Sequence, residues 1–163
     1  MDKHFELTDK FIINAFGAKL FQIKCTRKIK YADIGDLGGY IEKEDNLYGD
    51  AWVSGDAQVS GNAQVSGYAR VSGYARVFSY ARVFGDARVS NDNEHCGFDC
   101  FGSANRHTHS YKTKSGKIEI TCGCFRGSIE EFEKQIKETH RGNEFERQYM
   151  AIVEVIKIKF GLK

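Results

Sequence analysis

The segment from Val53 to Arg70 reads Val-Ser-Gly-Asp-Ala-Gln, Val-Ser-Gly-Asn-Ala-Gln and Val-Ser-Gly-Tyr-Ala-Arg, and this six-residue repeat decides the fold. The unit recurs from residue 41 to residue 94, and an aliphatic residue begins each unit: Ile41, Leu47, Val53, Val59, Val65, Val71, Val77, Val83 and Val89. A period of six is typical of a β-helix, in which each unit supplies one short strand and one tight corner. Three units close a triangular coil of about eighteen residues, so the sequence predicts a short β-helix of about three coils.

Small residues mark the bends of this predicted helix. Alanine stands four places after each aliphatic residue from Ala51 to Ala87, where the wall must bend. Glycine or asparagine stands where a corner needs a positive φ, at Gly55, Gly61, Asn62, Gly67, Gly73 and Gly85. Because about eighteen residues complete a coil, we expect residues eighteen apart to lie on the same face.

The repeat divides the chain into three predicted segments, and the fold class is mainly β. Residues 1–40 form an N-terminal β cap, with a half-buried strand near residues 20–27, and residues 41–94 form the β-helix. Residues 95–163 form a C-terminal α+β lobe, with a hairpin turn at Lys114-Ser-Gly-Lys117. Two helices end the lobe, because Ser128 with Glu131 makes a capping box and Asn143 with Glu146 starts a second helical pattern.

Composition places limits on the class of protein. The chain has 163 residues, a formal net charge of +2, 41% hydrophobic residues and no apolar run long enough to cross a bilayer. The N-terminal segment lacks the basic start and apolar stretch of a secretory signal, so we expect no membrane association and a cytoplasmic location. In that reducing compartment the five cysteines are expected to be free thiols or metal ligands.

The last repeats are richer in arginine and aromatic residues than the first, which favours a partner-binding surface there. The predicted surface comprises Trp52, Tyr68, Arg70, Tyr74, Arg76, Tyr80, Arg82, Phe84 and Arg88, with Phe78 also replacing a repeat serine. Two alternatives use the same residues. They can form an ordinary strand surface without a partner, or they can bind nucleic acid through phosphate contacts and base stacking.

The C-terminal lobe contains cysteine and histidine residues at spacings that zinc sites tolerate. Candidate ligands for a structural zinc are Cys122, Cys124, His107 and His109, and Cys96 and Cys100 have a C-x3-C spacing. Buried thiols are the alternative, since free cysteine packs as a small hydrophobe. Cys122 or Cys124 with His140 could form a nucleophilic pair, but the sequence shows no group to orient the histidine. No other cofactor is expected.

The repeat resembles that of the hexapeptide-repeat proteins, and this resemblance implies that the β-helix is left-handed. Many members are acyltransferases with a catalytic histidine on a coil, whereas the repeats here contain no histidine. A narrower resemblance rests on Asp36-Leu-Gly-Gly-Tyr-Ile-Glu-Lys-Glu-Asp-Asn-Leu47, on the hexapeptides and on Cys122-Gly-Cys-Phe-Arg-Gly127. These segments are similar to a family of phage and prophage proteins in which a short β-helix precedes a lobe with a Cys-Gly-Cys-Phe segment.

These observations together predict a non-enzymatic, phage-type binding protein. We expect it to inhibit a host protein complex, such as a CRISPR effector or another anti-phage defence effector, in the host cytoplasm. We also expect a homo-oligomer, with a dimer favoured. Two alternatives remain: a relative of the hexapeptide-repeat acyltransferases, and a sponge that binds a nucleotide signal between protomers.

Overall fold

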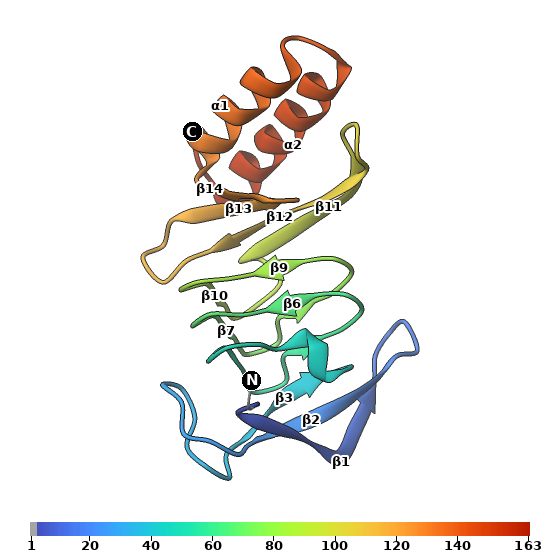
Figure 1. Cartoon of the computed structure of the whole chain (residues 1–163), viewed down its shortest axis with the longest axis vertical. Helices are drawn as coiled ribbons and strands as arrows, with labels where there is room; N and C mark the ends of the chain where they lie inside the picture. Colours follow the sequence, from blue (N-terminus) through green and yellow to red (C-terminus); the bar gives the residue numbers. More distant parts are fainter. Residues whose placement is uncertain (1–2) are drawn as a thin grey trace. The chain divides into compact units, whose positions relative to one another are not determined.

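The computed structural model describes residues 3–163 and separates into two compact units, Met1–Asp92 and Asn93–Lys163 (Figure 1). Within the described residues the structure is mainly strands, with two α-helices in the second unit. The first unit contains both the predicted N-terminal cap and the repeats. The second unit contains the predicted α+β lobe.

The first unit is built from three longer strands followed by a series of two-residue strands. The longer strands are β1 (Phe5–Ile13), β2 (Lys19–Cys25) and β3 (Leu37–Ile41), and a 3-10 helix follows at Glu44–Asn46. The short strands are β4 (Trp52–Val53), β5 (Gln58–Val59), β6 (Gln64–Val65), β7 (Arg70–Val71), β8 (Arg76–Val77), β9 (Arg82–Val83) and β10 (Arg88–Val89).

The short strands pair in parallel with strands eighteen residues away, which confirms the expected spacing between residues on one face. Val71 of β7 lies between Val53 of β4 and Val89 of β10, and β3, β5 and β8 form a second row. Strands β6 and β9 form a third row, and Figure 1 shows these strands in successive turns of the chain. Backbone bonds connect the turns, as where Ser54 N donates to Val71 O at 2.9 Å.

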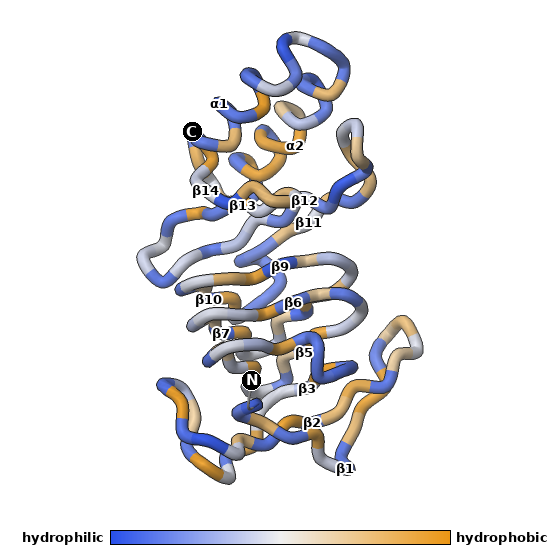
Figure 2. Tube along the Cα trace, in the orientation of Figure 1, coloured by the Kyte–Doolittle hydropathy of each residue, from blue (hydrophilic) through white to orange (hydrophobic). Residues whose placement is uncertain are grey.

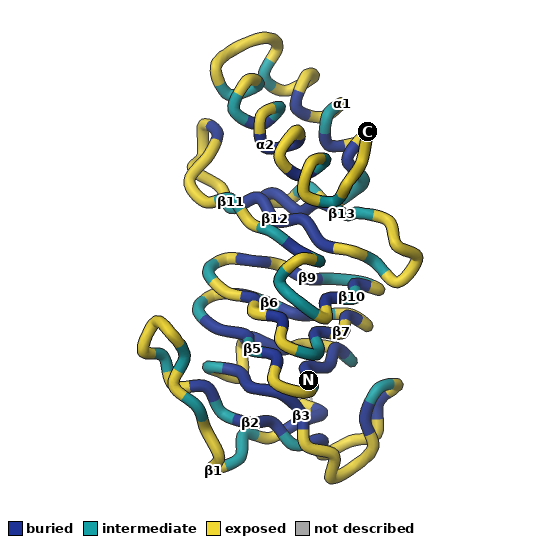
Figure 3. The backbone as a smooth tube through the Cα atoms, turned by 180° about the vertical axis from the view of Figure 1, so that it is seen from behind, coloured by how far each residue is buried: buried dark blue, intermediate teal, exposed yellow. Residues whose placement is uncertain are grey.

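The aliphatic and alanine positions of the repeat form the interior of the first unit. The repeat valines from Val53 to Val83 are fully buried, and the repeat alanines are buried beside them. Figure 3 shows this alternation as buried strands joined by exposed corners. Burial of each valine stabilises the fold by about 1.5 kcal/mol or more. The residues that define the repeat are therefore also the residues that form the core of the first unit.

One residue in each corner adopts the left-handed conformation. It is the third residue of the unit, as at Gly55 and Gly73, with φ of 65° and 62°. The prediction of a positive φ at Asn62 is wrong, because Gly61 before it already supplies the left-handed residue. In the unit that begins at Val77, Ser79 takes this position with φ 63°.

The N-terminal strands extend one of the repeat sheets. The order β1-β2-β3-β5-β8 joins an antiparallel β1–β2 hairpin and β3 to two repeat strands. The predicted strand near residues 20–27 is β2, with Leu20, Ile23 and Cys25 buried. Strand β1 was not predicted, and its pairing with β2 shifts register between Leu7 and Phe11.

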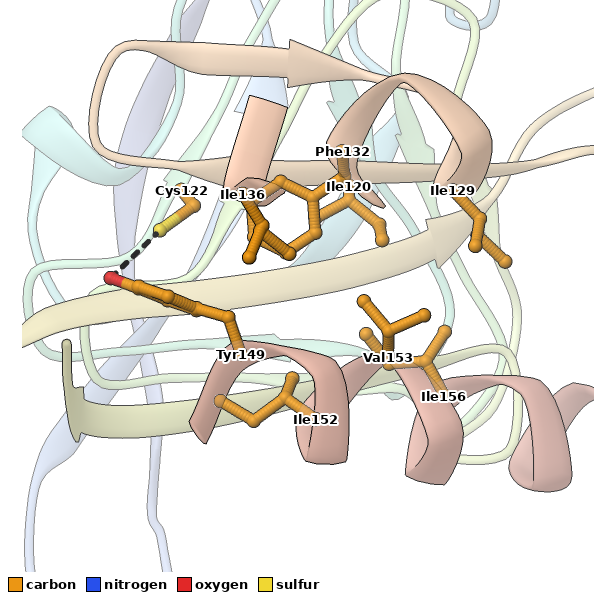
Figure 4. Close-up of a cluster of buried hydrophobic side chains, with 9 residues drawn as sticks. All are labelled: Ile120, Cys122, Ile129, Phe132, Ile136, Tyr149, Ile152, Val153 and Ile156. Carbon is orange, nitrogen blue, oxygen red and sulfur yellow. Dashed lines mark hydrogen bonds between the residues drawn. The ribbon is translucent and has the colours of Figure 1, made fainter. Parts of the chain in front are cut away.

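The second unit is a four-stranded antiparallel sheet with two helices on one face. The sheet contains β11 (His95–Phe101), β12 (Arg106–Lys112), β13 (Ile118–Cys122) and β14 (Phe125–Gly127). The helices are α1 (Ile129–His140) and α2 (Glu144–Phe160), and Figure 2 shows apolar residues along α2. The core between helices and sheet consists of Ile120, Cys122, Ile129, Phe132, Ile136, Tyr149, Ile152, Val153 and Ile156 (Figure 4).

Both predicted helix starts are confirmed by their hydrogen bonds. Ser128 Oγ accepts from Glu131 N at 3.2 Å while the Glu131 carboxylate accepts from Ser128 N, which completes the capping box. Asn143 Oδ1 accepts from the backbone N of Phe145 and Glu146. The predicted hairpin turn is also present, closed by Thr113 N donating to Lys117 O at 2.8 Å.

Candidate functional site

Three exposed aromatic side chains come from two turns of the first unit, and we call them the aromatic patch: Phe16, Phe78 and Tyr80. Their exposed fractions are 76%, 46% and 60%. The rings of Phe16 and Phe78 contact each other at a centroid distance of 5.6 Å, although they lie far apart in the sequence. Phe16 is supplied by the turn of the β1–β2 hairpin, whose tip is exposed in Figure 3.

Local hydrogen bonds hold the turn that carries Phe16. Asn14 Oδ1 accepts from the backbone N of Phe16 and of Ala18, both at 2.9 Å. Gly17 completes the turn with φ 79°. The sequence did not single out Phe16, and the available signal was an aromatic residue inside an Asn-Ala-Phe-Gly turn, where a bulky apolar side chain has no local core to enter.

Tyr68 and Tyr74 lie in other turns between the short strands. Their spacing of six from each other and from Tyr80 places the three tyrosines on successive corners, as the sequence indicated. Tyr74 is the most exposed of the three. The predicted partner-binding aromatics therefore lie in successive turns of the chain, and Phe78 in one of these turns contacts Phe16.

The four repeat arginines divide by their contacts. Arg76 Nε donates to Asp92 Oδ2 at 2.8 Å, and Arg76 N donates to Asp92 Oδ1 at 2.8 Å. Arg88 Nη1 donates to the Tyr68 carbonyl at 3.0 Å, and its Nη2 donates to the Tyr31 hydroxyl. Arg70, Arg76 and Arg82 are exposed on their strands, and Arg88 is half-buried. The contacts of Arg76 and Arg88 hold neighbouring segments of the first unit together.

Trp52 and Phe84 differ from the surface set predicted by the sequence. Trp52 is buried, because the N-terminal segment covers it: the His4 ring lies 6.1 Å from the indole ring, and His4 Nε2 hydrogen-bonds Ala51 O at 2.9 Å. Phe84 is half-buried. In this structure the Trp52 side chain belongs to the core.

The structure does not bring the four predicted zinc ligands together. Thr108 pairs with Cys122 and His109 pairs with Thr121, so Cys122 and His109 point to opposite faces of the sheet. Cys122 faces the helices, where its Sγ accepts from Thr108 Oγ1 at 3.3 Å. Cys124 lies exposed in the turn after β13. Among residues 3–163, no group of three or more His, Cys, Asp or Glu side chains is placed to hold a metal ion.

The histidines on the other face of the sheet pair with each other and with a carboxylate. His95 Nδ1 lies 3.0 Å from His109 Nε2, and His107 Nδ1 lies 2.5 Å from Asp99 Oδ1. The rings of His107 and His109 are 5.8 Å apart, as expected for two residues on the same side of β12. These contacts are compatible with a hydrogen-bonded polar face.

A cleft of about 460 Å³ in the second unit is lined by both candidate nucleophiles, Cys122 and Cys124, and by His140. Cys122 Sγ lies 3.8 Å from Tyr149 Oη, and burial raises the pKa of Tyr149 to about 12, so this phenol stays protonated at neutral pH. The ring contacts of His140 within the described chain are with Phe145 and Tyr149. No carboxylate hydrogen bond orients the His140 ring among residues 3–163, so the cleft lacks the third member of a nucleophilic triad.

Comparison with known proteins adds no family to these observations: no protein-family model matches the chain, and no curated protein matches it. Neither helix among residues 3–163 has the length and apolar character needed to cross a bilayer.

Proposed function

We propose that this chain is a non-enzymatic, phage-type binding protein that inhibits a protein complex of the host, such as a CRISPR effector or another anti-phage defence effector. Residues 41–94 would form a short left-handed β-helix of about three coils that presents the binding surface. The parallel pairing of strands eighteen residues apart supports the β-helix. The handedness and the phage origin follow from the sequence resemblance. The proposed setting is the host cytoplasm.

The aromatic patch of Phe16, Phe78 and Tyr80 is the observation that carries this proposal. The contact between the exposed rings of Phe16 and Phe78 leaves apolar surface in water, and protein interfaces are enriched in aromatic residues. Arg82, two residues after Tyr80, is an exposed arginine, a residue type that interfaces favour. The rings stand on a backbone that is held by hydrogen bonds, as where Gln64 N donates to Ala81 O at 2.9 Å. Binding would therefore require little ordering of the surface.

Self-association forms part of the proposal, with a dimer favoured. Strand β1 is at the edge of its sheet, and its side chains Phe11 and Ile13 are exposed. An apolar edge strand is a template for pairing with a second copy. Native mass measurement of the free protein tests this part, and a strictly monomeric mass at micromolar concentration would contradict it.

The chain supplies its own matched variants for testing the patch. Ser60 and Asn62 stand eighteen residues before Phe78 and Tyr80, on the same corner of the preceding coil. The double variant Phe78→Ser/Tyr80→Asn therefore installs a corner sequence that this fold already accommodates. Tyr74→Asp is the control, since it removes an exposed ring from a different corner and installs the residue found at Asp56.

The experiment captures host proteins from the lysate of a plausible host with the wild-type chain and with both variants. We expect the wild type to capture a stoichiometric protein complex, the Tyr74→Asp variant to retain it, and the double variant to lose about 30-fold or more in affinity, as removal of an interface hot spot does. Equal capture by the double variant would contradict the assignment of the patch. The absence of any captured complex would contradict the binding function.

A further inference from the structure

A cavity of about 750 Å³ opens in the first unit beside the N-terminal segment. Its volume lies within the range of small-molecule sites, about 300–1,000 Å³. The lining residues are Lys3, His4, Phe5, Arg27, Leu47, Tyr48, Gly49, Asp50, Gly67 and Tyr68. The aromatic patch contributes none of them, so the cavity is a separate feature of the unit.

Two tyrosines and two glycines are among the residues that line the cavity. Tyr48 and Tyr68 are 43% and 52% exposed, so each presents part of its ring to solvent. Between them, Gly49 lies against Gly67 so closely that a Cβ built on Gly49 would come within 3.2 Å of Gly67 N. Gly49 and Gly67 contribute no side chains to the cavity, and Tyr48 and Tyr68 both line it. Such walls suit a flat aromatic ring, because stacking on tyrosine needs a free ring face.

Basic side chains surround Tyr68 and the cavity. Arg27 and Lys3 line it, paired with Asp50 at 2.9 Å and with Glu44. Lys30 and Arg88 lie beside Tyr68: Lys30 Nζ is 6.0 Å from the centre of its ring, and Arg88 donates to its carbonyl.

Lys30 and Arg88 are two basic residues that contact Tyr68. Lys30 and Arg88 form no salt bridge with a carboxylate in the described part of the chain, and both approach the ring of Tyr31, at 5.4 and 4.7 Å. Two cations thus lie on the same aromatic ring, that of Tyr31. Such a pair attracts an anion with more than one negative charge, and phosphate has that property.

We propose that this cavity binds a nucleoside phosphate, with the base between Tyr48 and Tyr68 and the phosphate held by the basic side chains around Tyr68. The ligand is bound within a single chain. The same chemistry is available from a free mononucleotide or from one nucleotide of a single strand, and the titrations below separate these sources. This inference does not depend on the aromatic patch or on any host protein.

Isothermal titration calorimetry of the full chain provides the test, with AMP, ADP, adenosine, inorganic phosphate and a ten-residue oligothymidylate as the probes. We expect AMP or ADP to bind, with adenosine and inorganic phosphate each at least about tenfold weaker because each lacks one half of the recognised group. Tighter binding of the oligonucleotide than of AMP or ADP would assign the site to a single strand. No heat with any of the nucleotides at concentrations up to about 1 mM would overturn the proposal.

Matched variants locate the binding. Tyr48→Ser installs the residue that stands eighteen positions later, at Ser66, and combined with Tyr68→Ser it removes both ring faces. We expect this double variant to weaken nucleotide binding about 5- to 150-fold, the range for loss of base stacking. Lys30→Gln should weaken the binding of AMP and ADP more than the binding of adenosine. Tyr74→Asp should leave the affinity for all three ligands unchanged. Unchanged affinity in the double variant, with Trp52 fluorescence confirming its fold, would overturn the placement of the ligand.

Discussion

Gly73→Ala should destabilise the first unit far more than Gly55→Ala, although both glycines occupy the same position of the repeat. Both have a left-handed backbone, with φ of 62° and 65°. Alanine in that conformation costs about 1–2 kcal/mol, partly offset by about 0.4–1 kcal/mol from the reduced freedom of the unfolded chain. Each substitution therefore begins with a net cost of about 1 kcal/mol.

The two sites differ in the space above them. A Cβ on Gly55 would lie 3.3 Å from Gly73 O, a tight contact that a small shift relieves. A Cβ on Gly73 would lie far inside the contact distance of the Ser90 carbonyl oxygen, which is backbone and cannot rotate away. Overpacking of this kind adds about 1–3 kcal/mol, so we expect Gly73→Ala to cost about 2–4 kcal/mol in total.

Trp52 provides an assay confined to the first unit. It is the single tryptophan of the chain, and it lies buried in β4. Urea unfolding followed by its fluorescence gives the free energy of unfolding for both variants and the wild type, and an unchanged slope with urea would show that the compared states are equivalent. Equal destabilisation by Gly73→Ala and Gly55→Ala would refute the argument that the Ser90 carbonyl oxygen leaves no space for a Cβ at position 73.

Two further predictions concern a buried histidine and a helix cap. Burial lowers the pKa of His4 below its ordinary value of 6.5, so the folded state prefers the neutral ring. Its contribution to stability is complete above pH 6.5 and is lost as the pH falls below that value, because the unfolded chain binds the proton first. The free energy of unfolding, followed by Trp52 fluorescence, should therefore decrease as the pH falls below 6.5. The decrease should be smaller in His4→Gln, since His4 is the only histidine in residues 1–92 of the sequence. Ser128→Ala should cost about 1 kcal/mol through loss of the α1 cap, measured by unfolding at 222 nm, with Ser103→Ala as an unaffected control; equal values would contradict the capping role.

The repeats were predictable because one local rule determines both their core and their pairing. A period of six places each valine inside, and three units bring Val53 beside Val71 without any further information. Helix starts were predictable for a similar reason, since a cap such as Ser128 acts on residues three places away. The missed strand β1 lacks such a rule: its register shift includes Asp9 and Lys10, which interrupt the apolar alternation.

The candidate sites depended on contacts between distant segments, and these were not predictable from spacing. Phe16 and Phe78 meet only because the β1–β2 hairpin reaches the later coil. Trp52 is buried by His4, which is also remote from it in the sequence. Alternation along a strand correctly placed His107 and His109 on one side, but it does not determine the register between strands. In the register that the structure shows, Cys122 pairs with Thr108 and lies on the face opposite His109.

The corner that carries the aromatic patch departs from the repeat at three successive positions, and this supports a functional role for it. The preceding coil has Ser60-Gly-Asn62 at this corner, whereas the later coil has Phe78-Ser-Tyr80. The central substitution places Ser79 at φ 63°, where a residue with a Cβ costs about 1–2 kcal/mol. Stability alone would favour glycine at that position. Strain of this kind collects at functional sites, and here it lies between the two exposed rings that the proposed partner would contact.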